Sequence, residues 1–118
     1  MEPILTIDKY GTKEWKLNDK HHREDGPAIE FPNGDKRWYI NGQRHREDGP
    51  AVVYGQMEAK FWYINGELHR ENRPGLIYSD GGKEWYINGK LHNEKGPAII
   101  DEYGTKKWYI NGKQHRED

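Results

Sequence analysis

Short apolar segments alternate with polar, glycine-rich segments along the whole chain. One kind reads Trp-Tyr-Ile after two charged residues, as at 36–40 and 106–110. The other kind begins with proline and continues with small and aliphatic residues, as at 27–31. Both are about five residues long, which is a typical length for a β-strand. No window places apolar residues at the spacing of an amphipathic helix. The pattern therefore predicts an all-β protein.

Alternation within the aromatic segments assigns their side chains to two faces. Successive side chains of a strand point to opposite faces, so Trp38 and Ile40 share one face and Tyr39 lies on the other. We expect the tryptophans and isoleucines to form a ladder that holds neighbouring hairpins together. The tyrosines either pack on Ile29, Val52, Leu76 and Ile99 or form an aromatic surface for a partner. These tyrosines are Tyr39, Tyr63, Tyr86 and Tyr109.

The five tryptophans recur at a nearly constant interval. They are Trp15, Trp38, Trp62, Trp85 and Trp108, separated by 23, 24, 23 and 23 residues. Such a period is typical of a tandem array in which each unit needs its neighbours to bury a face. We predict a single domain, residues 1–118. Its approximate repeats 1 to 5 are residues 3–26, 27–49, 50–73, 74–96 and 97–118.

Two kinds of turn separate the segments of a repeat. Pro32-Asn33-Gly34 accepts the positive φ of a tight hairpin and joins the proline-led strand to the aromatic one. The Asn-Gly that follows each Trp-Tyr-Ile could likewise close a two-residue hairpin, with a third, very short strand around His45 or His92. We favour one hairpin per repeat, with Asn-Gly opening a longer connection.

Composition and charge narrow the class of protein. Charged residues make up 33% of the chain and hydrophobic residues 32%, which is close to the composition of disordered chains. However, the aromatic residues recur at fixed positions, and this indicates an ordered array with a thin core. No stretch approaches the roughly 20 apolar residues of a membrane span, and the start of the chain lacks the features of a secretory signal. Without cysteine, the chain fits an intracellular setting, and we predict a cytoplasmic protein with no membrane span. A formal net charge of −1 gives no field that would attract nucleic acid, so we predict no nucleic-acid partner.

A His-Arg-Glu-Asp element recurs once in each repeat and is the sharpest chemical feature. Histidine and glutamate occur in all five copies, whereas the other two positions vary. We favour a structural role in which histidine donates to a backbone carbonyl or to the loop glutamate, the Asp or Asn supports the turn, and arginine pairs with a neighbouring repeat. The alternative is a ladder of ligand-binding sites. The candidate binding residues of this element are His45, Arg46, His69, Arg70 and His92.

Metal binding and catalysis are not expected. Two strands per repeat at about 4.8 Å each place equivalent histidines roughly 10 Å apart, too far to share one zinc ion. No serine, cysteine or threonine accompanies the His-Glu pair in every repeat to act as a nucleophile. We therefore predict no metal site, no cofactor and no enzymatic activity.

The sequence resembles MORN repeats over essentially its whole length. The residues that carry the resemblance are Asn-Gly-Lys-x-His, a following glycine, a short strand, Asn-Gly or Asp-Gly and an aromatic strand, on a 23-residue period. The likeness is greatest to bacterial and viral variants of the repeat. It implies five tandem β-hairpins laid side by side as one elongated, twisted antiparallel sheet. It also implies protein–protein contacts, membrane-lipid binding for some members, and antitoxin or immunity partners for some bacterial members. Trp-Tyr-Ile stands here in place of the usual strand glycines.

Repeats 3 and 4 break the symmetry of the array. One extra residue enters between Ala51 and Trp62, and Asn72-Arg73-Pro74-Gly75 replaces Asp-Gly-Pro-Ala. The simpler explanation is neutral drift or a bulge that bends the sheet. The sharper hypothesis is a partner-specific patch. Its candidate residues are Met57, Phe61, Arg70, Arg73 and Tyr78.

Three functions remain open at this point. We favour a non-enzymatic scaffold that binds a protein partner as an inhibitor, immunity protein or adaptor, encoded by a phage or a bacterium. The second is a multivalent binder of small ligands, lectin-like or nucleotide-sequestering, with one site per repeat. The third is end-to-end self-association, because an open array exposes strand edges.

Overall fold

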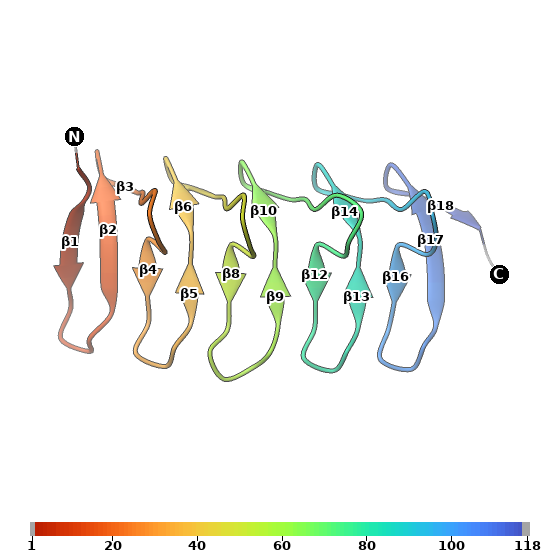
Figure 1. The fold of residues 1–118 in the computed structure, drawn as a ribbon, viewed down its shortest axis with the longest axis horizontal. Helices are drawn as coiled ribbons and strands as arrows, with labels where there is room; N and C mark the ends of the chain where they lie inside the picture. The colour runs from red at the N-terminus through yellow and green to blue at the C-terminus, as the bar shows by residue number, and fades with distance from the viewer. Residues whose placement is uncertain (1, 117–118) are drawn as a thin grey trace.

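The structure, a computed structural model, describes residues 2–116. These residues form strands and turns and no helix, and the molecule is elongated, with extents of 51 × 28 × 18 Å. Five hairpins stand side by side along the long axis in the order of the sequence (Figure 1). The prediction of an elongated all-β array of tandem hairpins is confirmed.

Each repeat contributes one hairpin to a sheet of twelve strands in which every neighbouring pair is antiparallel. Most of these strands are two residues long. The hairpins are β1 (Ile4–Ile7) with β2 (Lys13–Leu17), β4 (Ile29–Glu30) with β5 (Lys36–Arg37), β8 (Val52–Val53) with β9 (Lys60–Phe61), β12 (Leu76–Ile77) with β13 (Lys83–Glu84), and β16 (Ile99–Ile100) with β17 (Lys106–Ile110).

A second, smaller hairpin follows each large one. Tyr39 pairs with Arg44 and Ile40 with Gln43, while Asn41 and Gly42 between them have φ angles of 50° and 81°. Two successive positive φ angles match a type I′ turn, whose twist fits the flanking strands. Our prediction that Asn-Gly opens a longer connection is therefore wrong, and the alternative with a third short strand is correct. The remaining strands are β3 (Lys20–His21), β6 (Tyr39–Ile40), β7 (Gln43–Arg44), β10 (Tyr63–Ile64), β11 (Glu67–Leu68), β14 (Tyr86–Ile87), β15 (Lys90–Leu91) and β18 (Lys113–Arg116).

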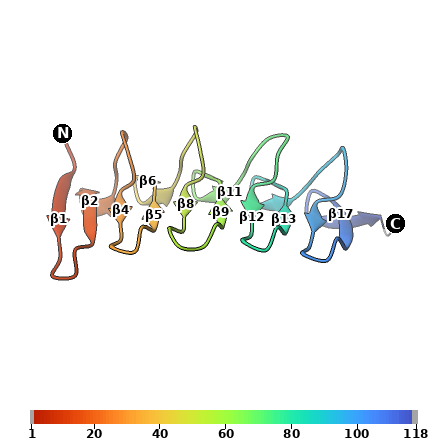
Figure 2. The ribbon, with the colours of Figure 1, turned by 60° about the horizontal axis from the view of Figure 1, so that its bottom comes forward.

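Burial is concentrated in the proline-led strands. Ala28, Ala51 and Ala98 have no exposed surface, whereas the tryptophans are only half-buried. The backbone nitrogen of Trp38 donates to the carbonyl of Ala51 at 2.8 Å, so small alanines lie directly beside the large rings of the neighbouring strand. The sheet is a single layer, and its core is correspondingly thin. The loops that join one repeat to the next rise on one side of the sheet (Figure 2).

The two faces carry different residues. Trp38 and Ile40 line one surface together, as do Trp62 with Ile64 and Trp85 with Ile87, and we call this side the tryptophan face. The other side is the tyrosine face. It holds the four tyrosines of the aromatic segments, and the strand register adds Arg37, Phe61 and Glu84, which pair with Ile29, Val52 and Leu76. The alternation read from the sequence is confirmed.

Candidate binding surfaces

We call the segment from the histidine of the His-Arg-Glu-Asp element to the residue before the next repeat the connection, as at 45–49 in repeat 2. The histidine of each connection joins its repeat to the next one. The backbone nitrogen of Asn65 donates to Nδ1 of His45 at 3.0 Å. The same bond, at the same length, joins Asn41 to His22, Asn88 to His69 and Asn111 to His92. We predicted a histidine that donates to a backbone carbonyl or to the loop glutamate, and the second contact is present between His45 and Glu47. The recurring bond, in which the histidine accepts, is an additional one. The protein therefore uses the ring to hold the first residue of the next Asn-Gly turn.

The second ring nitrogen of these histidines faces the loop glutamate. Because Nδ1 accepts a hydrogen bond, the proton of the neutral ring resides on Nε2. Nε2 lies 3.3 Å from a carboxylate oxygen of Glu47 in repeat 2, and the corresponding distances in the other three interior connections run from 3.4 to 3.9 Å. The glutamates themselves are 76 to 82% exposed, so this second interaction is weak.

Backbone hydrogen bonds reinforce each boundary. The nitrogen of Arg46 donates to the carbonyl of Tyr63 at 3.1 Å, and the nitrogen of Gly66 donates to the carbonyl of Arg44 at 2.8 Å. Equivalent pairs recur at the other boundaries. The constant histidine of the connection thus has a structural explanation.

The arginine of the connection covers the tryptophan of its own repeat. Cζ of Arg46 lies 3.9 Å from the ring centroid of Trp38, and the same geometry joins Arg23 to Trp15 and Arg70 to Trp62. The guanidinium also donates to the carbonyl of the proline that opens the next repeat, at 3.1 to 3.2 Å. The prediction that arginine reaches the neighbouring repeat is confirmed. Its stacking on tryptophan was not foreseen.

Asn93 takes the place of this arginine in repeat 4. Its Nδ2 donates to the carbonyl of Pro97 at 2.9 Å, so the short amide keeps the hydrogen bond to the next repeat. An asparagine has no guanidinium to lay over the indole ring. Lys95 stands where repeats 1 and 2 have an aspartate that binds the arginine. Repeat 4 therefore keeps the hydrogen bond from the connection to the next repeat, but the charges of the connection differ from those of repeats 1 and 2.

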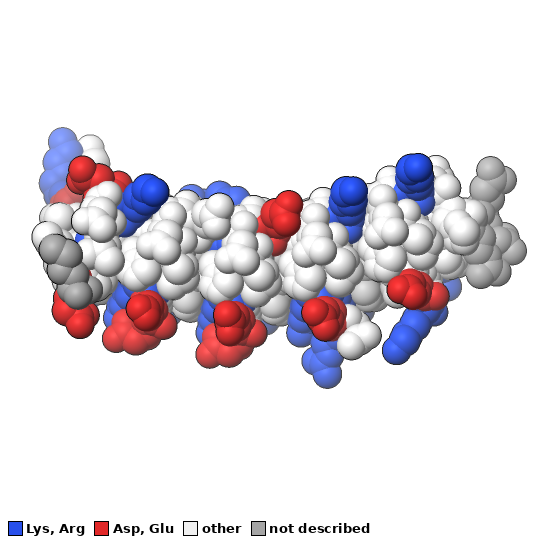
Figure 3. Space-filling view, turned by 90° about the horizontal axis from the view of Figure 1, so that it is seen from above, with Lys and Arg blue, Asp and Glu red and all other residues white. Residues whose placement is uncertain are grey.

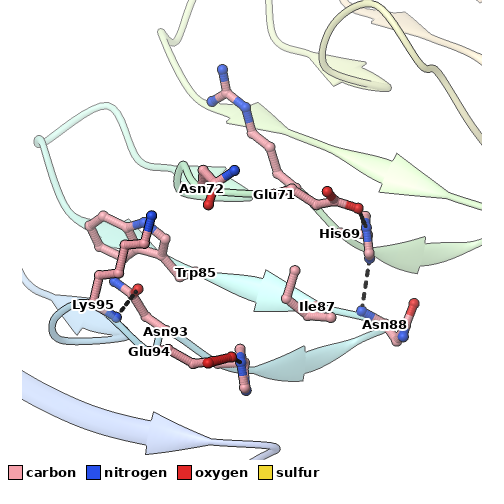
Figure 4. Close-up of a pocket in the computed structure, with 11 residues that line it drawn as sticks. His69, Glu71, Asn72, Trp85, Ile87, Asn88, Asn93, Glu94 and Lys95 are labelled. Atoms are coloured by element: carbon pink, nitrogen blue, oxygen red, sulfur yellow. Dashed lines mark hydrogen bonds and ion pairs between the residues drawn. The ribbon is translucent and has the colours of Figure 1, made fainter.

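Open grooves lie between consecutive connections on the tryptophan face. Their volumes are about 910, 610 and 550 Å³ between repeats 1 and 2, 2 and 3, and 3 and 4. In the last of these, Trp85 and Ile87 lie between His69 on one side and Asn93 on the other (Figure 4). Acidic side chains gather along one long side of the view that looks onto the connections (Figure 3). The grooves recur because the connections recur, and their arginines and histidines already bind within the chain.

The tyrosine face carries residue pairs whose chemistry changes from repeat to repeat. Cζ of Arg37 lies 4.9 Å from the ring centroid of Phe31 in repeat 2. At the equivalent positions of repeat 3, Tyr54 and Phe61 meet edge to face, with centroids 5.8 Å apart. In repeat 4, the hydroxyl of Tyr78 donates to Glu84 at 3.2 Å. Three equivalent sites thus present a cation, an apolar ring and a carboxylate.

The tyrosines of the aromatic segments contact the small hairpins and the neighbouring charges. The ring of Tyr39 lies 5.2 Å from that of His21, and Arg44 lies over Tyr63 and donates to its hydroxyl at 3.3 Å. The hydroxyl of Tyr86 donates to Glu84 at 2.7 Å. The pKa of this phenol is raised, mainly because the side chain is buried and secondly because of this hydrogen bond. All four of these tyrosines are half-buried, so each keeps part of its ring on the surface.

The structure does not bring the five candidates of the irregular patch together. Phe61 and Tyr78 lie on the tyrosine face, and Met57 is 54% exposed in the turn between β8 and β9. Arg70 lies over Trp62 on the tryptophan face, and the exposed Arg73 follows in the same connection. Burial, and then the charge of Arg73, lower the pKa of Arg70.

Sequence reasoning overlooked the position that precedes each tryptophan. It is occupied by Glu14, Arg37, Phe61, Glu84 and Lys107. The signal was present in the chain, since this position changes in charge and size within an otherwise constant segment. Only Phe61 was singled out, and for a different reason.

Within residues 2–116, no group of three or more histidine or carboxylate side chains could hold a metal ion. The same part of the chain contains no helix that could cross a membrane. No protein-family model matches the sequence, and no curated protein matches it either.

Proposed function

We propose that this chain is a non-enzymatic scaffold of MORN-like repeats that binds a protein partner through its tyrosine face. The observation that carries the proposal is the row of half-buried tyrosines combined with neighbours that change between the interior repeats, namely Arg37, Phe61 and Glu84. Tyrosine, phenylalanine and arginine, like tryptophan, are enriched at protein–protein interfaces, where a few residues supply most of the binding energy.

The tryptophan face supports this choice by contrast. Its arginines and histidines repeat the same internal contacts in successive repeats, so the fold alone accounts for their constancy. A partner that must dock in one register needs a surface on which the repeats differ. The tyrosine face has this property. The tyrosine face runs along the long axis of the molecule, which extends over 51 Å, and this length suits one extended contact with a partner.

The role of the complex is proposed from the resemblance to bacterial and viral MORN variants. We propose an inhibitor, an immunity protein or an adaptor, encoded by a phage or a bacterium and acting in the cytoplasm. Each of these roles requires one stoichiometric protein partner. The proposal therefore makes the stoichiometry of the complex its first measurable consequence.

The test is capture with tagged protein followed by native mass measurement of the complex. The Tyr39→Ala/Tyr63→Ala variant removes two rings from the tyrosine face, and the Glu47→Gln/Glu71→Gln variant neutralises two exposed carboxylates on the connections as a matched control. We expect one partner in a 1:1 complex with the parent and the control, and its loss with the tyrosine variant. A partner that binds the tyrosine variant with full affinity, while that variant remains folded by circular dichroism, contradicts the proposal.

A second candidate is a multivalent binder of small ligands, and the three equivalent grooves favour it. Each groove offers a tryptophan, an isoleucine and the polar groups of two connections. Native mass spectra with monosaccharides and nucleotides test it, because a repeated site loads several ligands on one chain. Several equivalent adducts per chain would favour this candidate over the protein-binding scaffold.

A further inference from the structure

A pocket lies between the turns of the fourth and fifth large hairpins. Its volume is about 220 Å³, the size of a side chain and not of a large ligand. Tyr78 and Glu84 line it from the fourth hairpin, and Ile99 and Tyr103 from the fifth. The complete lining is Tyr78, Asp80, Gly82, Glu84, Ile99, Ile100, Asp101, Glu102 and Tyr103. Because Glu84 belongs to the tyrosine face, the pocket adjoins the surface proposed to bind a protein.

Gly82 keeps this pocket open. A Cβ at this position would lie 3.2 Å from Oδ1 of Asp80 and 3.3 Å from Cδ2 of Tyr78, closer than ordinary side-chain contacts. The equivalent residues before the strand lysine in the other repeats all carry a side chain. They are Thr12, Asp35, Ala59 and Thr105. Repeat 4 is thus the repeat that has no side chain at this position, and a side chain there would crowd Asp80 and Tyr78, which line the pocket.

The charge of the pocket is negative. Asp80, Glu84, Asp101 and Glu102 line it, and its described lining contains no lysine or arginine. Three lysines flank the pocket without lining it: Lys107 pairs in register with Ile99, and Lys83 and Lys106 pair with Ile100.

Hydrogen bonds hold three of the carboxylates in place. Oδ1 of Asp80 accepts from the nitrogen of Gly82, and Oδ1 of Asp101 accepts from the nitrogens of Tyr103 and Thr105. Glu84 accepts from the hydroxyls of Tyr78 and Tyr86. These bonds fix the positions of the negative charges without neutralising them.

Two aromatic rings complete the site. Tyr78 is 40% exposed and Tyr103 is 86% exposed, so both present open ring surface at the rim. Aromatic rings together with carboxylates attract a cation, and an arginine side chain matches both because its planar guanidinium stacks on rings and forms paired bonds to carboxylates. We propose that this pocket receives an arginine side chain of the protein partner. The inference rests on the proposed function, since it names one contact of the same binding face.

Titration of the isotope-labelled chain with N-acetyl-arginine amide tests the pocket without the partner. We expect saturable changes in the backbone signals of Tyr78, Gly82 and Tyr103. The uncharged analogue N-acetyl-citrulline amide has the same shape and should bind about tenfold more weakly or worse, because the charge is lost. N-acetyl-lysine amide should also bind more weakly than the arginine probe, because its ammonium cannot stack or bind in a fork.

Variants of the pocket make the assignment specific. Asp101→Asn keeps an oxygen that accepts the turn hydrogen bonds and removes one charge, so it should weaken binding several-fold. Asp8→Asn is the matched control, because Asp8 accepts from Tyr10 and Thr12 in the same turn of repeat 1. Gly82→Thr introduces the side chain that repeat 5 carries at the equivalent position and should abolish the response.

Each outcome decides the inference. Saturable binding of the arginine probe that Gly82→Thr abolishes and Asp8→Asn leaves unchanged supports it. No saturable response, an equal response to citrulline, or an equal response in the Gly82→Thr variant overturns it. An equal response to the lysine probe overturns the choice of arginine. A failed titration leaves the scaffold proposal intact if the partner is still lost with the Tyr39→Ala/Tyr63→Ala variant, so the two failures are distinguishable.

Discussion

Nδ1 of His45 accepts a hydrogen bond of 3.0 Å from the backbone nitrogen of Asn65, a residue twenty positions further along the chain. Asn65 has a φ of 50°, a conformation that most residues avoid, and its turn is exposed to solvent. The ring thus satisfies a backbone donor in the turn, next to Gly66, whose nitrogen donates to the carbonyl of Arg44. Since the same bond recurs at four boundaries, it is a general means of joining one repeat to the next.

Removal of this acceptor should weaken the array. We expect His45→Ala to lower the free energy of unfolding by about 1–2 kcal/mol, because the nitrogen of Asn65 loses its partner and the packing of the ring is lost. Urea denaturation followed by tryptophan fluorescence measures the change. Glu47→Gln is the control: Glu47 is 82% exposed, and its loss should cost less than about 0.5 kcal/mol. Equal losses for the two variants would show that the bond to Asn65 contributes nothing.

The arginine of the connection makes two separable contributions. Arg46 stacks on Trp38 and donates to the carbonyl of Pro50, whereas Asn93 in repeat 4 makes only the corresponding hydrogen bond. We therefore expect Arg46→Asn to cost about 0.5–1 kcal/mol, the value of the stacking interaction. Arg46→Ala should cost roughly 1 kcal/mol more, because it also leaves the carbonyl without its donor. Denaturation midpoints of the two variants compare them directly, and an Asn variant no more stable than the Ala variant contradicts the assignment.

The sequence allowed the periodicity, the strand content and the assignment of faces to be predicted, because each follows from the spacing of Trp, Tyr and Ile. The small second hairpin could not be predicted with the same assurance. Its return strand, such as Gln43–Arg44, is polar and two residues long, so it carries no strand signal of its own. The pairing is imposed by the type I′ turn and by contacts with the neighbouring repeat.

The candidate site was likewise predictable from the sequence only in part. The tyrosines were found because alternation places them on one face. The grouping of Phe61 with Arg70 failed because the connection brings Arg70 back over Trp62, the residue next to Phe61, and adjacent strand residues point to opposite faces. The pairs that distinguish the repeats, such as Arg37 with Phe31, join positions six residues apart across a hairpin turn. Such pairs become visible only once the register of the hairpin is known.

Alkaline pH should destabilise the protein partly through Tyr86. Burial, followed by the hydrogen bond to Glu84, raises the pKa of this phenol above its ordinary value in the folded state. The unfolded chain therefore loses the proton first, so the stabilising contribution is complete below about pH 10 and is lost as the pH rises further. We expect the Tyr86→Phe variant to lose less stability than the parent between about pH 9 and about pH 11. Urea midpoints at the two pH values measure the difference.

Tyr103→Phe serves as the control for this measurement, because Tyr103 is 86% exposed. Its stability should fall with pH in parallel with that of the parent. Identical pH dependence of the parent and the Tyr86→Phe variant would show that the environment of Tyr86 does not oppose its ionisation.

Gly75 offers a substitution that should stabilise the array. Repeats 2, 3 and 5 have Ala28, Ala51 and Ala98 at this position, and all three are fully buried. A Cβ on Gly75 would meet Cβ of Tyr86 at 3.5 Å and Cβ of Arg70 at 3.8 Å, which are ordinary van der Waals distances. Gly75 does not have a positive φ, so alanine fits its backbone without strain. We expect Gly75→Ala to raise the free energy of unfolding by about 0.4–1 kcal/mol, because it restricts the unfolded chain.

Gly66→Ala is the matched control, a glycine-to-alanine substitution that should destabilise the protein. Gly66 has a φ of 84° in the Asn-Gly turn, where a Cβ is strained whatever space surrounds it. This variant should lower the free energy of unfolding by about 1 kcal/mol or more. Both substitutions add one methyl group to the same array, so a comparison of their urea midpoints isolates the effect of the backbone conformation. A destabilised Gly75→Ala variant would show that repeat 4 packs differently from its neighbours at this corner, and that its glycine is required there.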